Sequence, residues 1–207
     1  MLWLKRGGVF ALANIRGGEE YGEPWHQGGM RENKQNSFDD FIAGAEWLIE
    51  NYYTTPSRLA ITGASSGGLL VAASVNQRPD LFGAAVVEVG LLNMLRFHLF
   101  TVGRFWIQEH GNPDDPHDYA YLKKYSPCHN VREGVKYPSI LVCASETDDR
   151  VVPSHSYKYL MTLQSVHGKD KMLLRLNSNG GHNSAKSVDW INERADILTF
   201  IYQELEE

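Results

Sequence analysis

The chain has 207 residues, of which 43% are hydrophobic, and a formal net charge of −5. This length suits one globular domain with a sizeable core, and the mildly acidic balance argues against nucleic acid and anionic membranes as partners. No run approaches the roughly 18 consecutive apolar residues of a membrane span, and the first residues lack the layout of a signal peptide. The two cysteines, Cys128 and Cys143, do not make a disulfide framework, although one bond between them stays open. We therefore expect a reduced, cytoplasmic setting.

The first third of the chain predicts a strand, a loop, a helix and a second strand. Residues 8–15 are apolar on both faces and bounded by glycine, which is typical of a buried parallel strand. The glycine-rich residues 16–29 predict a loop. Residues 37–52 carry an apolar stripe at helical spacing, with Ser37 as the expected cap. A short strand over residues 58–62 follows.

The rest of the chain continues this alternation around one irregular stretch, residues 91–124, which is rich in aromatic residues, proline and histidine. Three further apolar runs predict strands, at residues 83–90, 139–144 and 172–176. Two longer amphipathic runs predict helices, at residues 153–166 and 187–205. Strands that alternate with helices imply a mostly parallel sheet with helices on both faces, so the predicted fold class is α/β in three layers.

The strand at 58–62 runs directly into Gly63-Ala64-Ser65-Ser66-Gly67, and an apolar helix follows at once. Gly-x-Ser-x-Gly between a strand and a helix is the pattern of a nucleophile elbow, in which a strained turn lifts the serine hydroxyl clear of the backbone. We expect Gly63 and Gly67 to leave room for the close approach of strand and helix. Outside this context the same five residues also occur as ordinary glycine-rich loops.

An acid and a base follow later strands, in the chain order Ser, Asp, His that α/β-hydrolases use. Asp148 and Asp149 come after the strand at 139–144, and His182 comes after the strand at 172–176. A serine hydroxyl needs a base to take its proton, histidine can do so near neutral pH, and a carboxylate fixes the imidazole tautomer. Because all three follow strand ends, we expect them at one rim of the sheet.

Each of these residues also has a less specific interpretation. Asp148 or Asp149 could cap the next helix or lie in solvent, and His182 could be an ordinary loop residue. No His-Glu-x-x-His or paired Cys-x-x-Cys occurs, so we expect neither a metal nor another cofactor.

Four long stretches carry a family resemblance: residues 13–22, 76–83, 125–127 and 148–153. From about Gly7 to its end, the chain resembles the C-terminal catalytic domain of the prolyl oligopeptidase family of serine peptidases. The resemblance implies Ser65 as nucleophile, Asp148 as the orienting acid and His182 as base. It also implies that the backbone N–H of Ser66 contributes half of the oxyanion hole.

The resemblance assigns three further residues to substrate binding. Trp106 would stack on the proline ring of the substrate, Arg150 would hold a substrate carbonyl near the cleavage point, and Val151 lies beside it in the same motif. Without the resemblance, Trp106 would be interpreted as a core aromatic and Arg150 as a surface charge.

The sequence also departs from the family pattern. Family members carry a β-propeller, further strands before the first strand here, and a tyrosine that forms the other half of the oxyanion hole. Tyr21 lies in a different loop and is not that tyrosine. We therefore expect residues 1–207 to form a single, N-terminally truncated α/β-hydrolase domain with an open site. Its bare sheet edge favours pairing with another chain, so a homo-oligomer is possible.

Together these features predict a serine hydrolase that cleaves peptide bonds after proline, carboxylic esters, or both, through an acyl-enzyme. The expected substrate is a small peptide or an ester. Two alternatives stay open at this point: an esterase whose substrate is not a peptide, and a truncated fold without catalytic activity.

Overall fold

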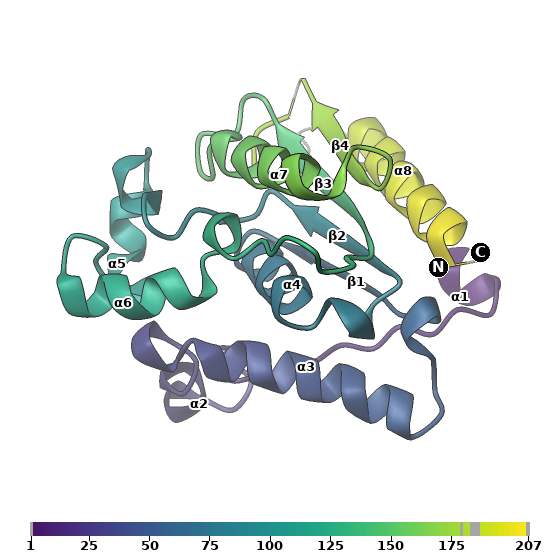
Figure 1. Cartoon of the computed structure of the whole chain (residues 1–207), viewed down its shortest axis with the longest axis horizontal. Coiled ribbons are helices and arrows are strands. Elements are labelled where there is room, and N and C mark those ends of the chain that lie inside the picture. Colours follow the sequence, from purple (N-terminus) through teal and green to yellow (C-terminus); the bar gives the residue numbers. More distant parts are fainter. Residues whose placement is uncertain (1, 179, 183–186, 206–207) are drawn as a thin grey trace.

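The computed structural model describes residues 2–178, 180–182 and 187–205, and a parallel sheet lies at its centre (Figure 1). The sheet order is β1-β2-β3-β4, and every neighbouring pair is parallel. The strands are β1 (Ala60–Ala64), β2 (Ala84–Glu88), β3 (Ser139–Ser145) and β4 (Met172–Asn177). Parallel strands end at the same rim, so residues that follow β1, β3 and β4 meet there.

Helices cover both faces of the sheet, which confirms the predicted three layers. On one face lie α4 (Ser66–Gln77), α7 (Ser154–His167) and, packed on α4, α3 (Gln35–Glu50). On the other face lie α8 (Ser187–Leu205) and α1 (Leu2–Lys5). The side chains of β2 alternate between these layers: Ala85 and Val87 belong to the core cluster beneath α4, and Ala84 and Val86 to the cluster beneath α8. Burial on both sides explains why this strand is a continuous apolar run.

The predicted strand at residues 8–15 is wrong. No strand forms there, and Val9, Phe10 and Leu12 are 72%, 67% and 80% exposed. Apolar composition cannot by itself make a strand, because a strand needs a neighbour for its backbone hydrogen bonds. β1 is an edge of the described sheet and does not pair with this segment.

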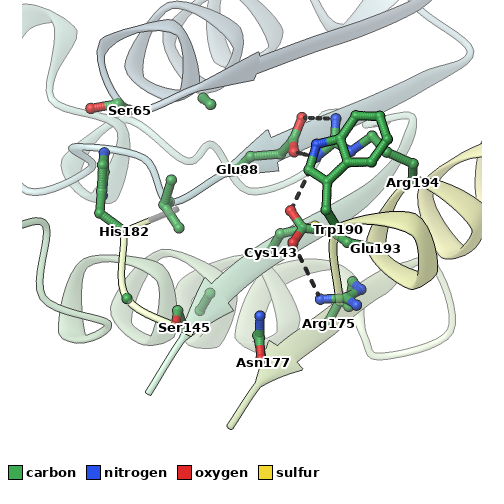
Figure 2. A pocket seen from close by; sticks show the side chains of 14 residues that line it. Ser65, Glu88, Cys143, Ser145, Arg175, Asn177, His182, Trp190, Glu193 and Arg194 are labelled. Carbon is green, nitrogen blue, oxygen red and sulfur yellow. Dashed lines mark hydrogen bonds and ion pairs between the residues drawn. The ribbon is translucent and has the colours of Figure 1, made fainter. Parts of the chain in front are cut away.

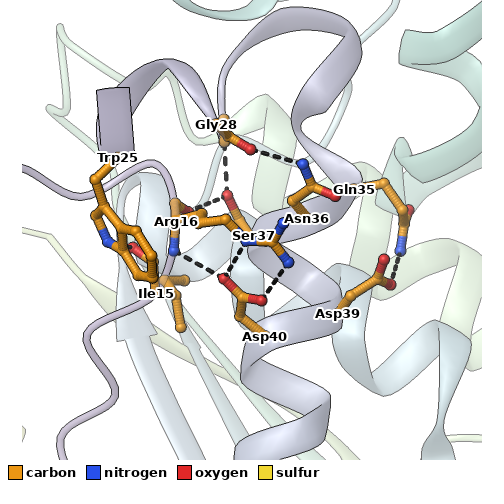
Figure 3. Close-up of polar contacts among 10 residues, drawn as sticks. Ile15, Arg16, Trp25, Gly28, Gln35, Asn36, Ser37, Asp39 and Asp40 are labelled. Atoms are coloured by element: carbon orange, nitrogen blue, oxygen red, sulfur yellow. Dashed lines mark hydrogen bonds and ion pairs between the residues drawn. The ribbon is translucent and has the colours of Figure 1, made fainter. Parts of the chain in front are cut away.

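The next segment is held by polar contacts to α3 (Figure 3). The Arg16 guanidinium forms an ion pair with Asp40, whose carboxylate also accepts the Arg16 backbone N–H at 3.0 Å. Ser37 does not cap the helix as predicted, because α3 begins at Gln35. Its buried hydroxyl instead donates to the Arg16 carbonyl at 2.6 Å. The predicted loop also holds a short helix, α2 (Glu23–Gln27).

The irregular stretch contains short helices, including α5 (Ile107–His110) and α6 (Pro116–Tyr125). Cys128 and Cys143 are both free, which settles the open question of a bond between them. In the part of the chain that the structure describes, every helix is too short or too polar to span a bilayer.

Candidate active site

Ser65 occupies a strained turn between β1 and α4. Its backbone angles are φ 58° and ψ −116°, a conformation that a residue with a side chain rarely adopts. Gly63 makes the turn possible, since a Cβ there would lie 2.4 Å from the Gly67 carbonyl oxygen. The Ser65 N–H donates to the Glu88 carbonyl at 2.9 Å, so the end of β2 supports the turn.

The expected reason for Gly67 is wrong, and its neighbour has the role instead. A Cβ on Gly67 would meet no atom of the described residues within 4 Å. A Cβ on Gly68 would lie 2.7 Å from the Gly90 Cα and 2.9 Å from the Glu88 carbonyl oxygen. The close approach is therefore between the first turn of α4 and the segment after β2. The second glycine of the pattern Gly-x-Ser-x-Gly is Gly67, whereas the glycine that the close approach requires is Gly68.

Ser66 is the first residue of α4. The backbone N–H groups in the first turn of a helix have no carbonyl partner within that helix, and they lie at its positive end. The Ser66 N–H is thus a donor adjacent to the Ser65 side chain.

Asp148 and His182, which lie 34 positions apart, are hydrogen-bonded. The distance from His182 Nδ1 to Asp148 Oδ2 is 2.8 Å, and the Asp148 side chain is fully buried. The other oxygen, Oδ1, accepts the backbone N–H groups of Arg150 and Val151 at 2.9 Å each. Because an ionised carboxylate only accepts hydrogen bonds, Nδ1 carries the proton and Nε2 is left as the basic nitrogen.

Ser65 and His182 line the same cavity, which has a volume of about 470 Å³. Figure 2 shows both residues on one side of it, with the imidazole extending toward the serine. The three predicted residues thus gather at one rim of the sheet.

The far wall of this cavity is charged, a feature that we did not expect from the sequence. Neighbouring ion pairs on this wall connect Glu88, Arg194, Glu193 and Arg175 (Figure 2). Arg175 also pairs with the exposed Asp196. Burial lowers the pKa of the Arg194 guanidinium, but its hydrogen bonds to Glu88 and Glu193 outweigh burial and raise that pKa above its ordinary value. The sequence did contain a signal for this charged wall, because Glu88 is a charged residue at the end of an otherwise apolar buried strand.

The predicted substrate-binding residues lie on the other face of the sheet from α8. Val151 is buried and Trp106 is half-buried, and both pack in one apolar cluster with Leu91 and Phe97. Arg150 is exposed, so its side chain is open to solvent beside Asp148.

One group of described residues has ligand atoms spaced for a metal ion, namely Asp115, His117 and Asp118, within 4.8 Å of one another. Their carboxylates already have protein partners. Asp115 caps α6 by accepting two backbone N–H groups, and Asp118 accepts the Asn112 N–H and pairs with Arg31. Helix capping and loop anchoring account for this group.

A serine elbow between a parallel strand and a helix, on a sheet covered on both faces, defines an α/β-hydrolase fold. The model of the prolyl oligopeptidase family matches residues 1–207. The chain belongs to the prolyl oligopeptidase family.

Individual relatives agree with this assignment. The prolyl endopeptidase of Dictyostelium discoideum is 49% identical over 201 residues, which are 95% of this chain and 26% of that protein. The prolyl endopeptidase of Elizabethkingia miricola is 44% identical, with 99% of this chain and 29% of that protein covered.

Solved structures show the same likeness in three dimensions. A post-proline cleaving enzyme from Rickettsia typhi has a TM-score of 0.96 and 38% identity, covering 99% of this chain and 30% of that chain. Prolyl oligopeptidase B from Galerina marginata, solved with a 35mer hydrolysis and macrocyclization substrate, has a TM-score of 0.92 and 44% identity over 97% of this chain and 29% of that chain. The chain thus spans under a third of the length of these relatives.

Proposed function

We propose that this chain is a serine hydrolase of prolyl oligopeptidase type, which cleaves small peptides after proline through an acyl-enzyme. One observation carries the proposal: the hydrogen bond between His182 Nδ1 and Asp148 Oδ2, at the cavity that Ser65 also lines. The names of the relatives, prolyl endopeptidase and post-proline cleaving enzyme, support the choice of substrate.

In the proposed mechanism Ser65 Oγ attacks the carbonyl carbon that follows the proline ring, while His182 Nε2 takes the hydroxyl proton. The C–N bond then breaks, and the same proton passes from Nε2 to the departing amine. Water attacks the acyl-enzyme by the same route and restores the Ser65 hydroxyl. Asp148 keeps the imidazole oriented and stabilises its charged form.

Charge that develops on the carbonyl oxygen would be held by the Ser66 N–H. A helix N-terminus favours negative charge, which adds to this donor. A site that lacks one of two oxyanion donors typically loses about 10²–10³ in rate.

The proposed acyl-side contacts are Trp106, Val151 and Arg150. Trp106 and Val151 share an apolar cluster, which suits a proline ring. The exposed Arg150 can donate to a substrate carbonyl.

Esters are the second proposed substrate class. A single assigned oxyanion donor, the Ser66 N–H, favours substrates with a better leaving group than an amine. We therefore expect p-nitrophenyl esters to be cleaved at least as well as a prolyl-p-nitroanilide. Comparing kcat/KM across acyl-chain lengths and peptides would separate an esterase with a non-peptide substrate from a peptidase.

The deciding experiment is labelling with a fluorophosphonate probe, together with turnover of both substrate types. Stoichiometric labelling at Ser65, abolished in Ser65→Ala, is the expected result. Full-rate turnover by Ser65→Ala, or no labelling of the unsubstituted chain, would contradict the proposal. The latter outcome would favour a fold without activity.

We also propose that the chain associates with a second copy of itself, because β1 is an edge strand and residues 9–12 expose apolar side chains. A cytoplasmic setting stays a prediction of the sequence.

A further inference from the structure

Glu88 is a buried carboxylate with partners on two sides. It is the last residue of β2, and its side chain is 8% exposed. Oε1 accepts the Thr62 hydroxyl from β1 at 2.9 Å and one Arg194 N–H at 3.4 Å, and Oε2 accepts a second Arg194 N–H. A carboxylate this deeply buried is stable only because both oxygens are paired.

The backbone of the same residue supports the nucleophile. The Glu88 carbonyl accepts the Ser65 N–H, and it also lies against Gly68 in the first turn of α4. The next residue, Val89, has φ 41°, a conformation that a β-branched side chain rarely adopts. Strain of this kind persists only where surrounding contacts hold the backbone in place. The contacts of the Glu88 side chain with Thr62 and Arg194 therefore hold the backbone directly next to the strained residue Val89.

Arg194 connects this point to the helix that follows His182 in the sequence. It lies on α8, and its guanidinium pairs with Glu88 and with Glu193. The Glu88–Arg194 ion pair thus connects the end of β2, which supports Ser65, to α8, which follows His182 in the sequence. Glu88 and Arg194 both line the cavity that Ser65 and His182 also line (Figure 2).

We propose that Glu88 is a positioning residue for the reaction: through Thr62 and Arg194 it holds the strained backbone at Glu88 and Val89, and thereby the orientation of Ser65 relative to His182. This inference rests on the proposed function for its catalytic consequence. The structural part, the support of the Ser65 N–H, can be measured without activity.

The test compares Glu88→Gln with Asp196→Asn. Glu88→Gln keeps the side-chain size and the Thr62 contact but removes the charge that Arg194 binds. Asp196→Asn is the matched control, because it weakens another ion pair of α8, that with Arg175 on β4, without touching β2. Both should lower the unfolding temperature by a few degrees at most.

Two measurements separate positioning from general stability. We expect Glu88→Gln to lower kcat about 10- to 100-fold, since small misplacements of reacting groups have effects of this size, with KM changed less than about twofold. We also expect faster amide exchange at Ser65 in Glu88→Gln and no change of either quantity in Asp196→Asn. The Arg194→Met variant, which leaves the buried Glu88 carboxylate without its cation, should show both changes at least as strongly as Glu88→Gln.

Unchanged Ser65 exchange in Glu88→Gln would overturn the inference, whether or not the chain is active. So would a loss of kcat no larger than that of Asp196→Asn. If the unsubstituted chain takes up no fluorophosphonate, the proposed function fails, and the exchange experiment alone decides on Glu88.

Discussion

Asp148 uses both carboxylate oxygens for different tasks. Oδ2 accepts from His182 Nδ1, and Oδ1 accepts the backbone N–H groups of Arg150 and Val151. One buried side chain therefore sets the imidazole tautomer and also shapes the loop that carries Arg150 and Val151. Asp149, its exposed neighbour, has neither role.

Asp148→Asn should therefore lower kcat about 10⁴-fold, because an amide can hold the imidazole in the wrong tautomer. Steady-state kinetics on a p-nitrophenyl ester would measure the loss, with Asp149→Asn as the matched control at near-normal activity. Equal activity of the two variants would contradict the assignment of the acid.

A second prediction at this scale concerns His155 on α7. Its Nδ1 accepts the Asn93 N–H at 3.0 Å, and burial, aided by Lys158, lowers its pKa to about 4. The unfolded chain therefore binds this proton at higher pH than the native chain does. Stability should be fully present above pH 6.5 and should fall by roughly 3 kcal/mol as pH drops toward 4.

Urea unfolding at pH 7 and pH 4.5 measures this dependence. His155→Asn keeps an acceptor for the Asn93 N–H and should flatten the pH dependence. Part of it should remain, because burial lowers the pKa of His110 to about 3. If His155→Asn shows the same difference in unfolding free energy between pH 7 and pH 4.5 as the unsubstituted chain, the buried imidazole of His155 is not the source of the pH dependence.

At the scale of elements, the elbow depends on how closely α4 approaches the segment after β2. Gly68→Ala would force the Glu88 and Gly90 backbone to move and should destabilise the chain by about 1–3 kcal/mol, with loss of activity. Gly67→Ala, one position earlier, meets open space and should be neutral or stabilising by up to about 1 kcal/mol. Thermal unfolding of both variants checks this; equal effects would contradict the close approach.

At the scale of the whole molecule, the segment that was expected to be a strand contributes three strongly exposed apolar side chains, those of Val9, Phe10 and Leu12. Phe10 and Leu12 are far more exposed than core residues of similar size, and β1 lies at the edge of the sheet that the described residues form. Contiguous exposed apolar groups and open sheet edges both promote association.

Sedimentation should accordingly give masses above the 23.4 kDa of one chain, rising with concentration. The double substitution Phe10→Lys and Leu12→Lys should lower the apparent mass toward that of one chain. Tyr52→Lys, at a position that is 95% exposed elsewhere on the surface, is the control and should have no effect. A single-chain mass at all concentrations would contradict the proposed self-association.

The sequence alone was sufficient for the four strands of the sheet and for the helices α3, α4, α7 and α8, because an apolar run or stripe has to be buried in any fold. It was also sufficient for the nearness of Asp148 to His182, because residues that follow parallel strands lie at the same rim of the sheet. Only the tertiary structure decided the rest. Residues 8–15 need a neighbouring strand that no local pattern can supply, and the role of Gly68 depends on a segment 20 positions away. The Glu88–Arg194 pair joins residues 106 positions apart, and contacts of that range are set by packing rather than by spacing.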